Sequence, residues 1–154
     1  MKMIGKEFLT IGVLVAILLS AGAGSVYAHK GTDDNKPLIV KLTAEDKDKL
    51  NSTEYSLKLH VVGSDSLSLK GNGHYKVKND NAEVRNFEIT GSQVSNNGHL
   101  IILWGTEVGV EGVEQVVNIV VSVTDDAQPF VTYRNENGGH IFPDGTFQIE
   151  VKNL

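Results

Sequence analysis

The residues of this chain best suited to chemistry are its five histidines, because histidine ligates metals and transfers protons near neutral pH. The chain has no cysteine, which excludes thiolate metal sites, catalytic thiols and disulfides. It also contains neither a Gly-x-Ser-x-Gly segment nor a His-Glu-x-x-His segment, the patterns typical of serine hydrolases and zinc proteases. We therefore predict that the protein is not an enzyme.

His29 is the histidine that supports a specific chemical hypothesis. If a signal peptidase cuts after Ala28, the α-amine and imidazole of His29 form a chelate ring suited to Cu(II), which favours tetragonal nitrogen coordination. Such a histidine brace also needs a second histidine. The arrangement is similar to that of some exported copper proteins on sandwich folds, among them copper-carrier domains and polysaccharide monooxygenases. The resemblance implies a copper site at His29; the alternative is that His29 is an ordinary residue of a polar tail.

The other four histidines are expected at the surface. His60 and His74 lie on the outward phases of alternating segments, beside lysines. His99 and His140 each follow a glycine at the start of a predicted strand. None of them is close in sequence to another histidine, so a second copper ligand would have to come from the tertiary structure.

Two acidic pairs and one glycosylation sequon complete the candidate residues. Asp33-Asp34 and Asp125-Asp126 lack the alternating spacing of a calcium-binding loop, so we interpret them as acids of a tail and a turn. Asn51-Ser52-Thr53 is a sequon in a segment expected at the surface. Carbohydrate binding generally uses exposed aromatic side chains, whereas the sole tryptophan, Trp104, is predicted to be buried.

The first 28 residues are typical of a signal peptide. Lys2 and Lys6 precede an apolar run from Phe8 to Leu19, and Val26 and Ala28 provide the small residues that a signal peptidase requires. This predicts a secreted or cell-envelope protein with a signal peptide at 1–28, a polar tail at 29–36 and one domain at 37–154.

Two alternatives to cleavage after Ala28 remain at this point. The segment from Phe8 to Ala28 carries no charge and is long enough to serve as an uncleaved membrane anchor, since about 20 residues span a bilayer. Pilin-type processing after Gly5 would instead keep the apolar run as an assembly helix beginning near Glu7. Membrane contact is expected only through an uncleaved segment of this kind.

Short apolar segments separated by turn residues dominate residues 37–154. Tyr55–Val61 and Phe147–Val151 alternate apolar and polar residues, which is typical of half-buried strands. Leu100–Trp104 and Val116–Val123 are apolar almost throughout, and we expect them to pair at the centre of a sheet, buried on both faces. About eight strands are predicted, in an antiparallel β-sandwich of immunoglobulin-like or Greek-key type, with a β-barrel as the alternative.

Local patterns add four expectations to this fold. The charged segment Thr43–Ser52 is expected to form a connecting loop or a short helix. Gly71–Gly73 is expected to be a tight turn or bulge, and a phase change near Arg85-Asn86 predicts a second bulge. Pro143–Thr146 carries turn residues and is expected to join Gly139–Phe142 and Phe147–Val151 as a hairpin.

The predicted core is centred on the two apolar segments. We expect Ile102, Trp104, Ile119 and Val121 to be among the most buried residues. In the last strand, Phe147, Ile149 and Val151 should face the core, with Gln148, Glu150 and Lys152 in solvent.

The net charge of −5 argues against a nucleic-acid partner, because binding to phosphates depends on clustered positive charge. We therefore expect an exported, non-catalytic cell-surface or extracellular module that binds a protein or a small molecule, or that serves a structural role. The alternative function is that of a small copper-binding protein using His29.

Overall fold

A computed structural model describes the backbone of residues 14–20, 23–29, 36–95, 97–108, 112–124 and 127–154, and the side chains of those from residue 36 onward. These residues form strands, turns and connecting segments, which confirms the predicted all-β antiparallel class. Within the described ranges, no helix is long and apolar enough to cross a membrane.

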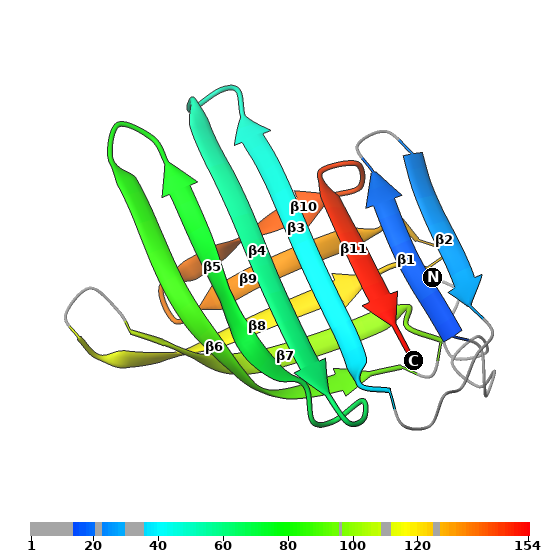
Figure 1. The fold of residues 1–154 in the computed structure, drawn as a ribbon. Helices are drawn as coiled ribbons and strands as arrows, with labels where there is room; N and C mark the ends of the chain where they lie inside the picture. The colour runs from blue at the N-terminus through cyan, green and yellow to red at the C-terminus, as the bar shows by residue number, and fades with distance from the viewer. Residues whose placement is uncertain (1–13, 21–22, 30–35, 96, 109–111, 125–126) are drawn as a thin grey trace.

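Nine strands form one antiparallel sheet in the order β10-β9-β8-β7-β6-β5-β4-β3-β11. Their bounds are β3 Leu38–Asp48, β4 Thr53–Gly63, β5 Lys70–Lys78, β6 Ala82–Val94, β7 Leu100–Val108, β8 Glu114–Ser122, β9 Phe130–Asn135, β10 Gly138–Pro143 and β11 Phe147–Lys152. From β3 to β10 each strand pairs with the next along the chain, whereas β11 returns to pair with β3 at the far end. The sheet folds over on itself, so that β3–β6 and β11 cross β7–β10 (Figure 1).

The remaining two strands, β1 (Leu14–Ser20) and β2 (Ala23–His29), pair with each other, and β1 lies beside β11 (Figure 1). Apart from His29, they fall within the predicted signal peptide, whose residues 1–13 and 21–22 lie outside the described residues. Cleavage after Ala28 remains a prediction.

The core lies between the two crossing halves of the sheet. Every strand from β3 to β11 contributes alternate side chains to it, as the period of two requires. Ile119 and Val121 are buried, as predicted. The register of β11 is also confirmed, because Phe147, Ile149 and Val151 are buried while the side chains between them face outward.

The expectation that β7 and β8 are buried on both faces is wrong. The two strands do pair near the middle of the sheet, but Ile102 is only half-buried and Trp104 is 41% exposed. Their inward neighbours, Ile101 and Leu103, are fully buried. No described segment covers the outer face of these strands, so apolar side chains there remain in contact with solvent.

Trp104 lies over a glycine of the neighbouring strand. A Cβ atom added to Gly91 would lie 2.7 Å from Cζ2 of the indole and still closer to Nε1 and Cε2. Gly91 pairs with Trp104 directly after the bulge that separates Ile89 from Gly91. The indole thus covers backbone that the missing side chain leaves open.

Gly91→Ala is expected to move the indole off the sheet. Because Trp104 is the sole tryptophan, its emission reports this directly: we expect a red shift and stronger acrylamide quenching. The free energy of unfolding should fall by about 1 kcal/mol, since an exposed ring can move aside. Gln93→Ala, an outward change on the same strand, is the control and should leave the emission unchanged. Unchanged emission from Gly91→Ala would contradict this placement of Trp104.

Three local expectations differ from the structure. The charged segment after Leu42 does not leave the sheet, because β3 continues to Asp48 with Ala44 buried and Glu45 outside. Gly71–Gly73 lies within β5, where the ring of Phe87 occupies the space of a Cβ on Gly73. The β5–β6 register is regular through Arg85, and the bulge lies at Thr90 instead.

The predicted hairpin between the last two strands is also wrong. The turn itself forms: Gly145 has a φ of 83° and the Thr146 amide donates to the Pro143 carbonyl at 3.1 Å. However, β10 pairs with β9 and β11 pairs with β3. The turn carries the chain from one end of the sheet to the other, and thereby brings the two ends together.

Side chains link β10 to β3 and β4, with which it forms no strand pairing. His140 of β10 lies with Nε2 2.8 Å from a carboxylate oxygen of Asp46 on β3. Its ring stacks on the ring of Tyr55 on β4, with 3.7 Å between the ring centroids, and meets the ring of Phe142 edge-on. His140 is therefore half-buried and structural rather than a free surface residue, because the folded sheet brings β3 and β4 against β10.

Candidate functional site

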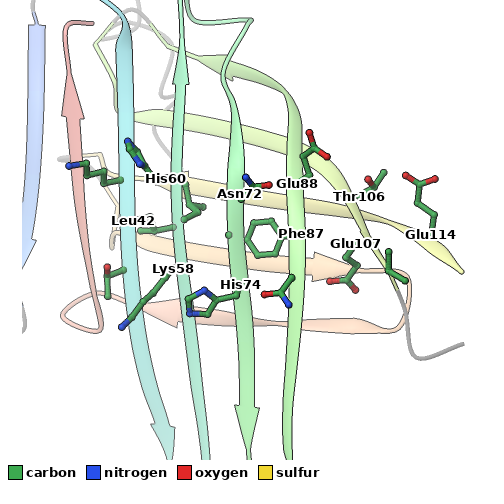
Figure 2. A pocket seen from close by; sticks show the side chains of 16 residues that line it. Leu42, Lys58, His60, Asn72, His74, Phe87, Glu88, Thr106, Glu107 and Glu114 are labelled. Carbon is green, nitrogen blue, oxygen red and sulfur yellow. The ribbon is translucent and has the colours of Figure 1, made fainter. Parts of the chain in front are cut away.

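A groove of about 800 Å³ crosses the outer face of the sheet from β3 to β8. Figure 2 shows Lys58, His60 and His74 on the side of β3–β5, and Glu88, Thr106 and Glu114 toward β6–β8. The lining residues are Lys41, Leu42, Thr43, Lys58, Leu59, His60, Asn72, Gly73, His74, Asn86, Phe87, Glu88, Thr106, Glu107, Val108 and Glu114.

Strand register places the polar lining side chains in two rows. The first row runs through directly paired residues of five strands: Lys41, His60, Asn72, Glu88 and Thr106. The second row runs beside it: Thr43, Lys58, His74 and Asn86. Adjacent strands lie about 4.8 Å apart, so each row presents a closely spaced series of polar groups.

The groove combines hydrogen-bonding groups with separated charges. The amides of Asn72 and Asn86 donate and accept hydrogen bonds, and the Thr106 hydroxyl does the same. Lysines and histidines lie toward β3, whereas the carboxylates of Glu88 and Glu114 lie toward β8. These groups can orient a polar ligand, but no nucleophile hydrogen bonded to a histidine lies among the lining residues.

One lining residue, Glu107, is a buried carboxylate held by the core. It accepts hydrogen bonds from the Tyr133 hydroxyl and from the Asn135 amide, and a guanidinium nitrogen of Arg85 lies 3.8 Å away. Tyr133 in turn stacks on Tyr75 at 4.0 Å. These contacts occupy both carboxylate oxygens, so Glu107 supports the wall of the groove rather than offering a free acid.

Burial raises the pKa values of Tyr75 and Tyr133 well above their ordinary value of 10.0, and hydrogen bonding to Glu107 adds to the effect at Tyr133. The folded state therefore keeps both protons where the unfolded chain loses them. The stability that this contributes is present below about pH 10 and falls as the pH rises further.

We accordingly expect the protein to unfold at alkaline pH. Ionisation of Tyr75 and Tyr133, measured by tyrosinate absorbance, should coincide with the loss of near-ultraviolet circular dichroism. The double variant Tyr75→Phe/Tyr133→Phe should lose the part of the absorbance change that accompanies unfolding. Ionisation of both tyrosines with the fold intact would contradict this expectation.

Of the four histidines whose side chains are described, the structure brings only two together. His60 and His74 lie on adjacent strands in the groove, on the outward phases predicted for them. His99 is half-buried beside Asn97, and His140 lies where β10 meets β3 and β4. Among residues with described side chains, no group of three His, Asp or Glu could hold a metal ion.

The remaining candidates are placed as follows. His29 ends β2, but its side chain lies outside the described ones, so the copper hypothesis remains a prediction. Asp33-Asp34 and Asp125-Asp126 also lie outside the described residues. Asn51 of the sequon lies in the exposed turn between β3 and β4, as expected.

Asn72, Asn86 and Glu107 are among the groove residues that the sequence did not indicate. Asn72 stands between two glycines, which suggested a turn, and Asn86 coincided with an apparent phase change. The available signal was the alternation of polar residues with Tyr75 and Val77 along β5, which marks Asn72 as an outward strand residue.

No family model, curated protein or solved structure matches this chain. Its function is therefore inferred from its own residues and their geometry.

Proposed function

We propose that this protein is an exported, non-catalytic β-domain that binds a polar ligand in the groove across β3–β8, at the cell surface or elsewhere outside the cytoplasm. The proposal rests on the two polar rows, in which side chains from consecutive strands face the groove of about 800 Å³. Ligand sites commonly have volumes of about 300–1,000 Å³.

The placement of the rows on strands supports a binding role. Asn72 and Asn86 project from β5 and β6, whose inward residues Tyr75, Phe87 and Ile89 are held in the core. The backbone of both asparagines is therefore fixed before a ligand arrives, which reduces the conformational entropy lost on binding. Export is supported by the signal-peptide pattern of residues 1–28.

The test begins with the purified domain on glycan and peptide arrays, followed by calorimetry with each ligand found. Asn72→Ala/Asn86→Ala should weaken binding about tenfold or more, because two hydrogen bonds of about 1 kcal/mol each are lost. Gln93→Ala/Asn118→Ala removes two amides from the outer face beyond the groove and should leave the affinity unchanged. Equal affinities for the two double variants would refute the assignment of the groove.

A further inference from the structure

The outer face of β3, β4 and β5 is basic, although the chain as a whole is acidic. The net charge of the chain is −5, yet six of its 14 lysine and arginine residues lie on this face together with two histidines. We call this set the basic face: Lys41, Lys47, Lys58, Lys70, Lys76, Lys78, His60 and His74. Positive charge is therefore gathered on one face of a chain that is acidic as a whole.

Strand register explains why these lysines gather. Lys47 and Lys78 lie on either side of Glu54 in one cross-strand row, and Lys58 pairs directly with His74 in another. Along each strand, outward residues repeat about every 6.8 Å, and neighbouring strands lie about 4.8 Å apart. Positive groups are thus spaced over a surface that continues into the groove.

The carboxylates on or beside this face do not neutralise it. The carboxylate of Glu54 lies 3.0 Å from the Lys47 ammonium and 3.8 Å from that of Lys78. The Lys58 ammonium lies 4.0 Å from the carboxylate of Glu45. Lys41 lies 4.0 Å from Glu150 of β11. These pairs are partly exposed, and pairs of this kind contribute little to stability, so the lysines can reorient toward a ligand.

The excess positive charge of the basic face is clearest at two lysines. Lys70 and Lys76, both on β5, form no ion pair with another described residue. They lie on the same strand as Asn72 and His74 of the groove, on the same outward phase. Unpaired cations therefore flank the hydrogen-bonding groups of the groove.

We propose that the ligand of the groove is an acidic polysaccharide, whose carboxylates lie against the basic face while its hydroxyls bind Asn72 and Asn86. This inference rests on the proposed function and names its ligand class. Amides suit hydroxyl groups because they both donate and accept hydrogen bonds, and lysines suit regularly spaced anions.

Two other polyanions fit this face less well. Single-stranded nucleic acids are bound by aromatic side chains that stack on bases, and the aromatic rings of β4 and β5, Tyr55 and Tyr75, pack in or against the core. An anionic membrane surface favours apolar side chains that insert beside the cations. The centre of the basic face offers asparagine, threonine and histidine instead.

The experiment measures binding to polygalacturonate, with its methyl ester as the uncharged counterpart. Wild-type protein should bind polygalacturonate and lose affinity as salt is added, because salt screens exposed charges. Lys70→Glu/Lys76→Glu should bind about tenfold more weakly or worse at low salt. Lys49→Glu/Arg134→Glu makes the same charge change off the face, on exposed residues of a turn and of β9, and should bind within about twofold of wild type.

Each remaining outcome is informative. Equal binding of polygalacturonate and its ester, or equal losses in the two charge variants, would overturn the role of the basic face. The Asn72→Ala/Asn86→Ala variant then shows separately whether the groove still binds a neutral glycan. Tighter binding to a single-stranded DNA oligonucleotide or to phosphatidylglycerol vesicles would overturn the polysaccharide assignment. Circular dichroism of every variant establishes that the fold is retained.

Discussion

Replacing Ile119 by alanine is expected to lower the free energy of unfolding by about 2–5 kcal/mol, the range for a fully buried isoleucine. Ile119 is completely buried on β8. It pairs with Leu103 of β7 on one side and with Tyr133 of β9 on the other, both of which are also fully buried. A cavity at this position removes contacts from the core between the two halves of the sheet.

Urea denaturation of Ile119→Ala, followed by far-ultraviolet circular dichroism, measures the change. Val116→Ala is the matched control, because Val116 lies on the same strand with 51% of its surface exposed, and its truncation should cost less than about 1 kcal/mol. Equal losses for the two variants would show that β8 does not have one buried and one exposed face.

Tyr133→Phe should lower the free energy of unfolding by about 2–3 kcal/mol, because a hydrogen bond to a buried carboxylate is lost while the carboxylate stays buried. The Tyr133 hydroxyl donates to Glu107, whose side chain is fully buried. The substitution keeps the ring that stacks on Tyr75, so packing changes little and the hydroxyl accounts for the effect.

A double-mutant cycle with Glu107→Gln isolates this interaction. In the Glu107→Gln background the acceptor is neutral, so removing the Tyr133 hydroxyl should cost less than it does beside the carboxylate. Additive losses in the two backgrounds would contradict a direct hydrogen bond. Asn137→Ala, an exposed change elsewhere at the β9–β10 turn, serves as the control for unrelated losses.

The groove could be predicted from the sequence only in part. The outward phases of His60 and His74 follow from strict alternation in their segments, and the structure confirms both. Asn72 and Asn86 were obscured because asparagine beside glycine is typical of turns, and local patterns do not distinguish a turn from a glycine-rich strand. Glu107 was obscured because an acidic residue at the end of an apolar segment is ordinarily exposed.

The basic face has no counterpart in any continuous segment. Its lysines come from three strands, and none of them is next to another lysine or an arginine in the sequence, so no run of positive charge exists. The register of β3, β4 and β5 alone brings Lys47 beside Lys78 across Glu54. The net charge of −5 describes the whole chain and does not reveal that positive residues gather on one face.

By itself, the sequence determined the all-β class and which side chains of each alternating strand face the core, as in Phe147, Ile149 and Val151. These properties are local, because the period of two follows from backbone geometry within one strand. Only the tertiary structure decided that β11 leaves its turn to pair with β3, that Trp104 lies exposed over Gly91, and that a groove crosses β3–β8. A turn and an alternating pattern specify how a strand begins and which face it buries, but they do not specify its neighbour. The neighbours are decided by the shared core of all nine strands, since β11 buries its apolar side chains by pairing with β3 at the end of the sheet.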